Sequence, residues 1–218
     1  FITLRCLILV ALLAAPVLRA HSVWVEDTPE KTLVVRFGEV GEKFETSPGH
    51  LDRLPLPVAW TPGPDGKPAR FTVEKKSDHF LFVSAAIAQP ALGETVFPVM
   101  KRGDRPASRP HFYLRWQPQG APIPPGPSLT LDLLPTGTTG EFRVYLRSQP
   151  LPQAVVVVQT AGKESEINAD AEGRFRFTVA PPGLVLLTCN HKENVKGFAA
   201  GAAYDVTSHN AALTWRQP

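Results

Sequence analysis

The sequence has few of the residues that crosslink a protein or bind soft metals. Its 218 residues include two cysteines and one methionine. Cys6 lies in an apolar N-terminal stretch, so a chain that has lost this stretch keeps only Cys189 and forms no intrachain disulfide. We interpret Cys189, in the apolar run GLVLLTCNH, as a small buried hydrophobic residue. The single methionine, Met100, argues against a methionine-rich Cu(I) relay.

Several enzyme motifs are also missing from the sequence. It contains no G-x-S-x-G nucleophile elbow, no H-E-x-x-H zinc motif and no glycine-rich phosphate loop. The acidic stretch EVGEKFE (39–45) is interpreted as a polar loop between strands. No basic face or run is visible either: the 23 lysine and arginine residues fall to 21 without Arg5 and Arg19, against 20 acidic residues. We therefore expect a protein that is not an enzyme and does not bind nucleic acid.

The first twenty residues are typical of a secretory signal peptide. Arg5 supplies the positive start, an apolar run from Cys6 to Val17 follows, and the small residue Ala20 closes the segment. The run is too short to span a bilayer comfortably. We expect cleavage after Ala20, a mature chain without a transmembrane segment, and a periplasmic or secreted location.

The remaining chain has the pattern of an all-β protein. Its many prolines argue against long helices. Apolar residues alternate in KTLVVRF (31–37), EFRVYLR (141–147) and GRFRFTV (173–179), which is typical of half-buried strands. The runs HFLFV (79–83) and AVVVVQ (154–159) are apolar on both faces and predict central, covered strands.

A proline-rich segment divides the predicted strands into two groups. QPQGAPIPPGPS (117–128) holds five prolines and two glycines, a composition that favours an extended spacer. We predict a signal peptide over 1–20, an Ig-like N-terminal β-sandwich over 21–116, a linker over 117–128 and a second β-sandwich over 129–218.

The second of these modules resembles a known type of sandwich. PLPQAVVVV (150–158), DAEGRFRF (170–177) and PPGLVLLT (181–188) are similar to strands and turns of transthyretin-like domains of the carboxypeptidase-regulatory type. The resemblance covers about 143–191. It implies a fold and carries almost no information about activity.

The two ends of the mature chain widen the resemblance. AHSVWVE (20–26) and AAYDVTSHNAALTW (202–215) are similar to a family of exported bacterial proteins often described as periplasmic components of nickel or cobalt uptake. In this family the mature chain starts with a histidine, matched by His21, and ends with a tyrosine and a histidine, matched by Tyr204 and His209. The resemblance implies a binding protein for a divalent transition metal, with a membrane metal transporter as a partner.

Histidines are the candidate metal ligands. The mature chain contains no H-x-H, H-x-x-x-H or C-x-x-C, so a metal site must be assembled from distant segments. After cleavage, His21 would carry an amine and an imidazole, nitrogens that suit nickel, cobalt or copper. We predict a site formed by His21 and His209, with His50 as a weaker third ligand and Asp205 and Tyr204 as residues that orient the His209 ring.

Each of these assignments has an alternative. His21 could be a solvated terminus, His209 a hydrogen-bonded core histidine, and His50 a solvated loop residue. Elsewhere, His191 is expected to pack on the same face as Cys189, and HFYLRW (111–116) is expected to turn His111, Tyr113 and Arg115 to a polar sheet surface. The alternative function is a structural or adhesive β-sandwich module that binds a protein or a glycan without metal.

Overall fold

The computed structural model describes residues 21–63, 67–160, 163–177 and 181–218, so the predicted signal peptide lies outside the described residues. The described part consists of β-strands and one short 3-10 helix, η1 (His50–Arg53). The prediction of an all-β protein is confirmed. None of the described helices is long or apolar enough to cross a lipid bilayer.

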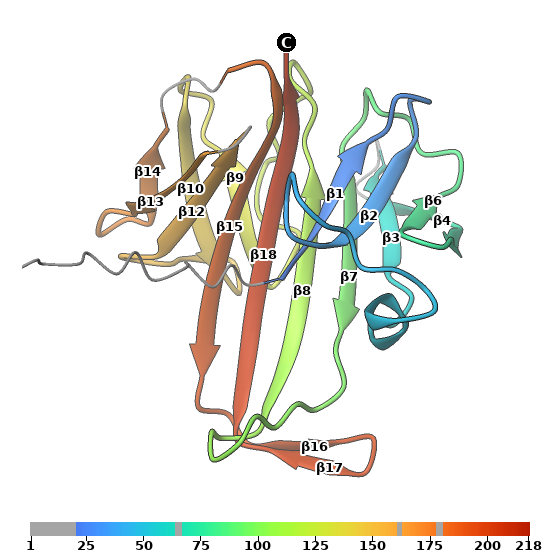
Figure 1. Cartoon of the computed structure of the whole chain (residues 1–218). Coiled ribbons are helices and arrows are strands. Elements are labelled where there is room, and N and C mark those ends of the chain that lie inside the picture. Colours follow the sequence, from blue (N-terminus) through green and yellow to red (C-terminus); the bar gives the residue numbers. More distant parts are fainter. Residues whose placement is uncertain (1–20, 64–66, 161–162, 178–180) are drawn as a thin grey trace, which may run out of the picture.

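The largest element is an eight-stranded sheet that runs through the middle of the molecule (Figure 1). All neighbouring strands in it are antiparallel except β18 and β8, which are parallel. In spatial order the strands are β13 (Lys163–Asn168), β12 (Val155–Thr160), β15 (Gly183–Glu193), β18 (Val206–Gln217), β8 (Ser108–Trp116), β7 (Ala91–Val96), β3 (Val58–Pro62) and β4 (Pro68–Phe71).

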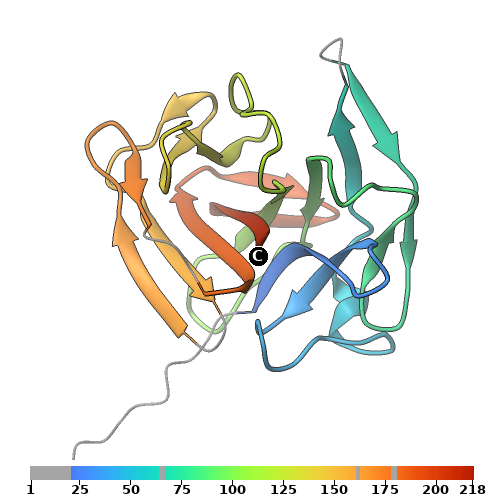
Figure 2. The ribbon, with the colours of Figure 1, turned by 90° about the horizontal axis from the view of Figure 1, so that it is seen from above.

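Smaller sheets cover the two faces of this central sheet. Seen from above in Figure 2, β18 lies at the centre, with the blue strands near the start of the chain on one side and the olive strands on the other. The first flanking sheet contains β1 (Ser22–Asp27), β2 (Leu33–Gly38), β6 (Phe80–Phe82) and β5 (Val73–Lys75). The second contains β9 (Leu131–Pro135), β10 (Glu141–Leu146), β11 (Gln149–Pro150) and β14 (Arg174–Arg176).

The alternation of side chains along β8 and β18 builds a hydrophobic core on each face. Leu114 and Ala212 pack in the core under β1 and β2, whereas Tyr113 and Leu213 pack in the core under β9 and β10. Successive residues of a strand point to opposite faces, so a strand covered on both sides needs side chains at successive positions that can be buried, one set in each core. Both flanking sheets therefore stabilise the same central strands.

The predicted polar face of 111–116 is wrong, because the second flanking sheet covers it. Tyr113 is 4% exposed and Arg115 is 1% exposed. The Arg115 guanidinium donates two hydrogen bonds to the Asp132 carboxylate, at 2.9 and 2.6 Å. A buried charge needs a close partner of opposite charge, and Asp132 in β9 supplies it.

Each of the two predicted covered strands is fully buried on one face only. In β6, Phe80 and Phe82 are each 1% exposed, but Leu81 on the alternate face is only partly buried. In β12, Val156 and Val158 are buried, but Val155 on the alternate face is 45% exposed. Neither strand is therefore fully covered on both faces, which corrects the expectation of two covered faces.

The two predicted modules share the central sheet. β8, which precedes the proline-rich segment, pairs with β18 from Ser108–Val206 to Trp116–Thr214. The Gln117 amide donates to the Thr214 carbonyl at 2.9 Å, so the segment 117–128 begins at the edge of this pairing. The boundaries of the modules stay a prediction, but the halves on either side of them are joined by backbone hydrogen bonds.

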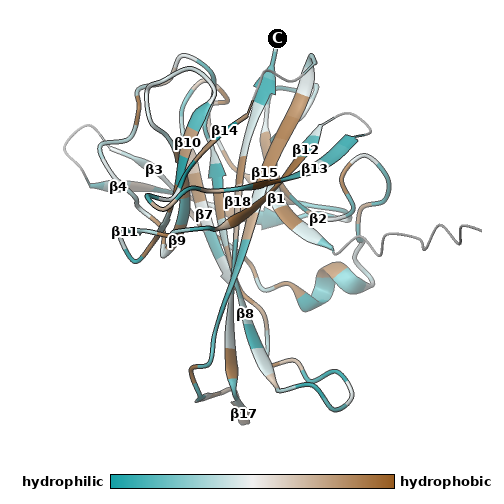
Figure 3. Ribbon diagram, turned by 90° about the vertical axis from the view of Figure 1, so that its left-hand side faces the viewer, coloured by the Kyte–Doolittle hydropathy of each residue, from teal (hydrophilic) through white to brown (hydrophobic). Residues whose placement is uncertain are grey.

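The long strands β8, β15 and β18 extend beyond the two cores. In Figure 3 their upper parts are mostly hydrophobic, whereas their lower parts are mainly hydrophilic. A short hairpin of β16 (Gly197–Ala199) and β17 (Ala202–Tyr204) lies across their lower end (Figure 1).

Candidate metal centre

His21 lies immediately before β1, and several contacts fix this strand. β1 pairs with β2 along its whole length, starting with Ser22 opposite Gly38. From the last strand, the Thr214 hydroxyl donates to the Val25 carbonyl at 2.6 Å. The first and last described strands of the chain are thus joined, and the backbone at His21 is held against the central sheet.

Glu45 reaches His21 because the chain folds back after β2. Gly38 and Phe44 form an isolated β-bridge, and the Glu45 amide donates to the Phe37 carbonyl at 2.7 Å. Phe37 also lies beside His21, with ring centroids 5.5 Å apart. The Glu45 side chain is 13% exposed, so it is a largely covered carboxylate beside a histidine.

His50 opens the 3-10 helix η1, which is anchored in the first core. Leu51 is fully buried and Leu54 is 2% exposed, and both pack in the core under β1 and β2. His50 itself remains on the surface, with its side chain 60% exposed. The apolar anchors therefore position an exposed imidazole.

A network of polar contacts around Asp52 fixes the loop that leads to His50. The Gly49 amide and the Ser47 hydroxyl donate to the two Asp52 carboxylate oxygens at 2.8 and 2.7 Å. Lys75 forms an ion pair with the same carboxylate. The hydrogen bonds from Lys75, Ser47 and Gly49 hold the pKa of Asp52 well below its usual range.

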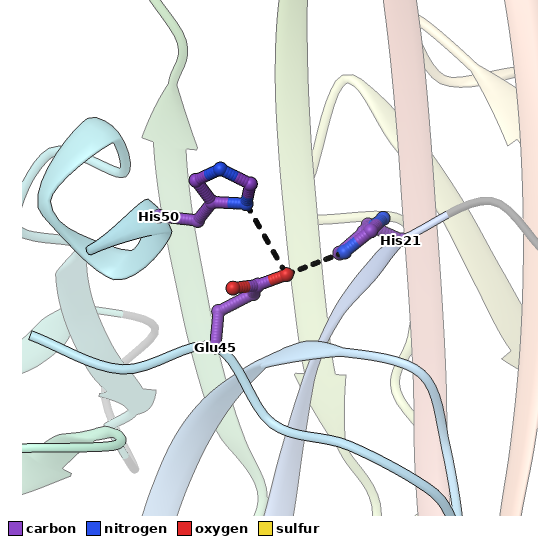
Figure 4. Close-up of side chains that lie close together, drawn as sticks. All are labelled: His21, Glu45 and His50. Carbon is purple, nitrogen blue, oxygen red and sulfur yellow. Dashed lines mark hydrogen bonds and ion pairs between the residues drawn. The ribbon is translucent and has the colours of Figure 1, made fainter.

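These three segments bring two histidines to one carboxylate oxygen (Figure 4). The Glu45 Oε1 atom lies 2.5 Å from His21 Nε2 and 3.4 Å from His50 Nδ1. One ligand atom from each of the three residues lies within 4.8 Å of the others. Burial by itself raises the pKa of Glu45, but the hydrogen bonds with His21 and His50 outweigh it and the net shift is downward.

The chemistry of this cluster suits a divalent transition metal. Two imidazole nitrogens and one carboxylate oxygen are donors that nickel, cobalt, copper and zinc accept. A metal ion would take the place of the hydrogen bonds that now join the rings to the carboxylate. The predicted ligands His21 and His50 are thus brought together, and the carboxylate between them is Glu45.

His209 lies on the opposite face of the central sheet from His21. In β18, Asn210 lines a cavity of about 390 Å³ together with His21 and Phe112. His209, the preceding residue, points the other way and packs on Tyr113, with ring centroids 5.8 Å apart. The structure does not bring His209 to His21, so the predicted pairing of these two ligands is not formed.

His209 is instead a hydrogen-bonded core histidine, the alternative role considered for it. It is 3% exposed. Its Nδ1 lies 2.9 Å from the Tyr113 hydroxyl and its Nε2 lies 2.8 Å from a Glu193 carboxylate oxygen. Burial lowers the pKa of His209, although the Glu193 carboxylate acts in the opposite direction. Both ring nitrogens therefore have protein partners.

The residues expected to orient His209 lie elsewhere. The ring of Tyr204 faces the Arg109 guanidinium, 5.9 Å from its centroid. Asp205 is exposed, and its backbone amide donates to the Ala107 carbonyl at 2.8 Å. The orienting role belongs to Tyr113 and Glu193. Glu193 is itself fixed by two hydrogen bonds from the Arg147 guanidinium, at 2.7 and 2.6 Å.

Three histidines form a row across the central sheet. His111, His209 and His191 occupy matching positions on β8, β18 and β15. The rings of His111 and His209 have centroids 5.7 Å apart. Cys189, in the same strand as His191, is 3% exposed, and burial raises its pKa to about 12. The prediction that Cys189 is a buried hydrophobic residue is confirmed.

Sequence reasoning missed Glu45 and the histidine row for different reasons. The row depends on the pairing of β8, β18 and β15, which are far apart in the chain. Glu45 depends on the way the chain folds back after β2. The only local signal for the metal site was the spacing of Glu45 and His50, which lie five residues apart on either side of a Pro-Gly turn, and this spacing is common in loops.

Comparison with models of known protein families gives no match, and a search of curated proteins finds no significant match either.

Proposed function

We propose that the protein is an exported, non-enzymatic binding protein that holds a divalent transition metal through His21, Glu45 and His50. The observation that supports this most strongly is the convergence of three ligand atoms, from three separate segments, within 4.8 Å. The metal is nickel, cobalt or copper, and the protein delivers it to a membrane metal transporter. The resemblance of its two ends to exported metal-uptake proteins supports the same function.

The exposure of the ligands fits delivery better than permanent storage. The side chains of His21 and His50 are 43% and 60% exposed, while Glu45 is largely covered. Structural metal sites are closed by four protein ligands, whereas open sites keep positions for exchangeable ligands. A site with three protein ligands and two exposed rings can pass its metal to a partner.

Export would complete the site. Cleavage after Ala20 leaves an α-amine on His21 itself, so one residue would then offer two nitrogens. This gives a donor set of three nitrogens and one oxygen, which suits copper and nickel.

Metal titration by calorimetry tests the proposal. We expect the exported protein to bind one nickel, cobalt or copper ion. Each of the variants His21→Ala, Glu45→Gln and His50→Ala should weaken metal binding by at least about tenfold, because the loss of a residue that only supports a ligand already lowers metal affinity by this factor. His79→Ala is the matched control, because His79 pairs with Asp78 and is not part of the cluster. This variant should bind metal as the wild type does.

Two outcomes would contradict the proposal. Binding weaker than micromolar in the wild type would favour the structural or adhesive module that needs no metal. Equal affinity in the wild type and in all three site variants would place the metal elsewhere in the protein.

A further inference from the structure

The lower end of the molecule carries an exposed apolar hairpin. β16 and β17 lie across the ends of the long strands (Figure 1), and the sequence of this hairpin, GFAAGAAY (197–204), contains no charged residue. Phe198 is 72% exposed, the largest value among the exposed large hydrophobic residues of the described chain. Contiguous exposed apolar surface, unlike single scattered residues, marks sites of interaction, and Phe198 is accompanied here by the exposed Ala200 and Ala203.

The pairing of the hairpin shows which face is free. Phe198 is opposite Ala203, and both are exposed. Gly197 is opposite Tyr204, and both are partly buried: the Tyr204 ring lies over Gly197 and faces Arg109 of β8. One face of the hairpin therefore packs inward, and the other presents Phe198 and small apolar side chains outward.

A cationic loop lies beside this hairpin. The Asp205 and Val206 amides, which follow β17, both donate to the Ala107 carbonyl, at 2.8 and 3.1 Å. The loop that ends at Ala107 presents three exposed cations, Lys101, Arg102 and Arg105, against one acidic residue, Asp104. Lys196, next to the hairpin, is exposed as well. We call residues 101–107 and 196–204 the basal tip.

The charge of the basal tip is a local feature. The chain after residue 20 has nearly equal numbers of basic and acidic residues, 21 and 20, once Arg5 and Arg19 are taken from the 23 basic residues. The four exposed cations of the tip outnumber the exposed carboxylates beside them, which are those of Asp104 within the tip and of Asp205 directly after it. The tip thus combines an outward aromatic residue with a surplus of long, flexible cationic side chains.

We propose that the basal tip docks on the surface of an anionic lipid bilayer. Phe198 would enter the boundary between headgroups and acyl chains, and the four cations would contact lipid phosphates. Each lysine or arginine near an anionic membrane is attracted to it, and aromatic side chains favour the interfacial region. A folded protein partner needs a complementary surface of about 800 Å² on each side. A two-stranded hairpin offers little such area, whereas a fluid bilayer adapts to it.

Vesicle sedimentation without added metal tests this proposal independently of the metal site. The protein, as purified from the exporting cell, is mixed with vesicles of phosphatidylcholine alone or of an equimolar mixture with phosphatidylglycerol. We expect binding to the anionic vesicles only, weakened by salt because the cations act through screened charges. Phe198→Ser should reduce the bound fraction by about tenfold. The triple variant Lys101→Gln, Arg102→Gln, Arg105→Gln should lose the preference for anionic lipid.

Leu56→Ser is the matched control, since Leu56 is 55% exposed but lies outside the basal tip, and this variant should bind vesicles as the wild type does. Equal binding to both kinds of vesicle, or an unchanged affinity in Phe198→Ser, would overturn the proposal. Self-association that depends on Phe198, seen by sedimentation velocity without binding to lipid, would also overturn it and assign the tip to a second copy of the chain. Circular dichroism of each variant confirms that it is folded.

Discussion

At the scale of single residues, Glu45 is the centre of the candidate site. Its Oε1 atom is the point on which both imidazoles converge, at 2.5 and 3.4 Å. A carboxylate in this position has two effects. It holds the rings in place before a metal arrives, and it supplies a negative charge that partly neutralises the metal. Its lowered pKa keeps it ionised over the physiological range.

The histidines of the cross-strand row have a different role, which is visible in their ionisation. Burial lowers the pKa of His111 to about 4, and the charges of Arg109 and His209 act in the same direction. Burial also lowers the pKa of His209. The folded protein therefore favours neutral imidazoles at this position of the sheet.

This ionisation predicts how stability depends on pH. An unfolded histidine binds a proton near pH 6.5. Between about pH 6.5 and pH 4 the unfolded chain therefore binds more protons than the folded one, and the free energy of unfolding decreases as the pH falls. Urea denaturation at several pH values across this range should show this decrease in the free energy of unfolding. The variant His111→Gln, whose new side chain cannot be protonated, should show a smaller decrease. An equally steep decrease in the variant would contradict this assignment.

At the scale of elements, the loop before η1 decides where His50 lies. Gly49 adopts φ 147°, a conformation that residues with a Cβ rarely adopt. A Cβ at this position would lie 2.8 Å from the Thr46 carbonyl oxygen, which is too close for the loop to remain where it is. The glycine is therefore needed for the approach of His50 to Glu45.

Gly49→Ala should accordingly displace His50. We expect a loss of about 1–3 kcal/mol in the free energy of unfolding, from the strained backbone, together with weaker metal binding in calorimetry. Gly41→Ala is the matched control: Gly41 also has a positive φ, 76°, but a Cβ there would meet nothing within 4 Å. This control should lose some stability and keep its metal affinity. Equal metal affinity in both variants would show that the loop does not position a ligand.

The strands themselves were largely predictable, because their signal is local. The alternation in 31–37 and 141–147 corresponds to β2 (Leu33–Gly38) and β10 (Glu141–Leu146). Which face of each strand is buried was less predictable. The sequence predicts Arg115 on the surface, whereas in the structure Asp132, on a strand beyond the proline-rich segment, forms a buried ion pair with it at 2.6 Å. The burial of a charged residue can be recognised only when its oppositely charged partner is known, and here the partner is distant in the sequence.

At the scale of the whole molecule, the two halves of the chain form one layered structure. The parallel pairing of β8 with β18 joins the strands on either side of the proline-rich segment into a single sheet. The sequence pattern shows which segments are strands, but it does not show which strands are neighbours. Strand alternation also separates two of the predicted ligands. It places His209 and Asn210 of β18 on opposite faces, and Asn210, not His209, lines the cavity with His21.

The most direct test of the metal site is an anomalous difference map from crystals of the exported protein grown with nickel, cobalt or copper. The account predicts one strong peak, about 2 Å from His21 Nε2, from His50 Nδ1 and from a carboxylate oxygen of Glu45, as transition-metal bonds require. A peak beside His209 and His111, or no peak on any histidine, would contradict it.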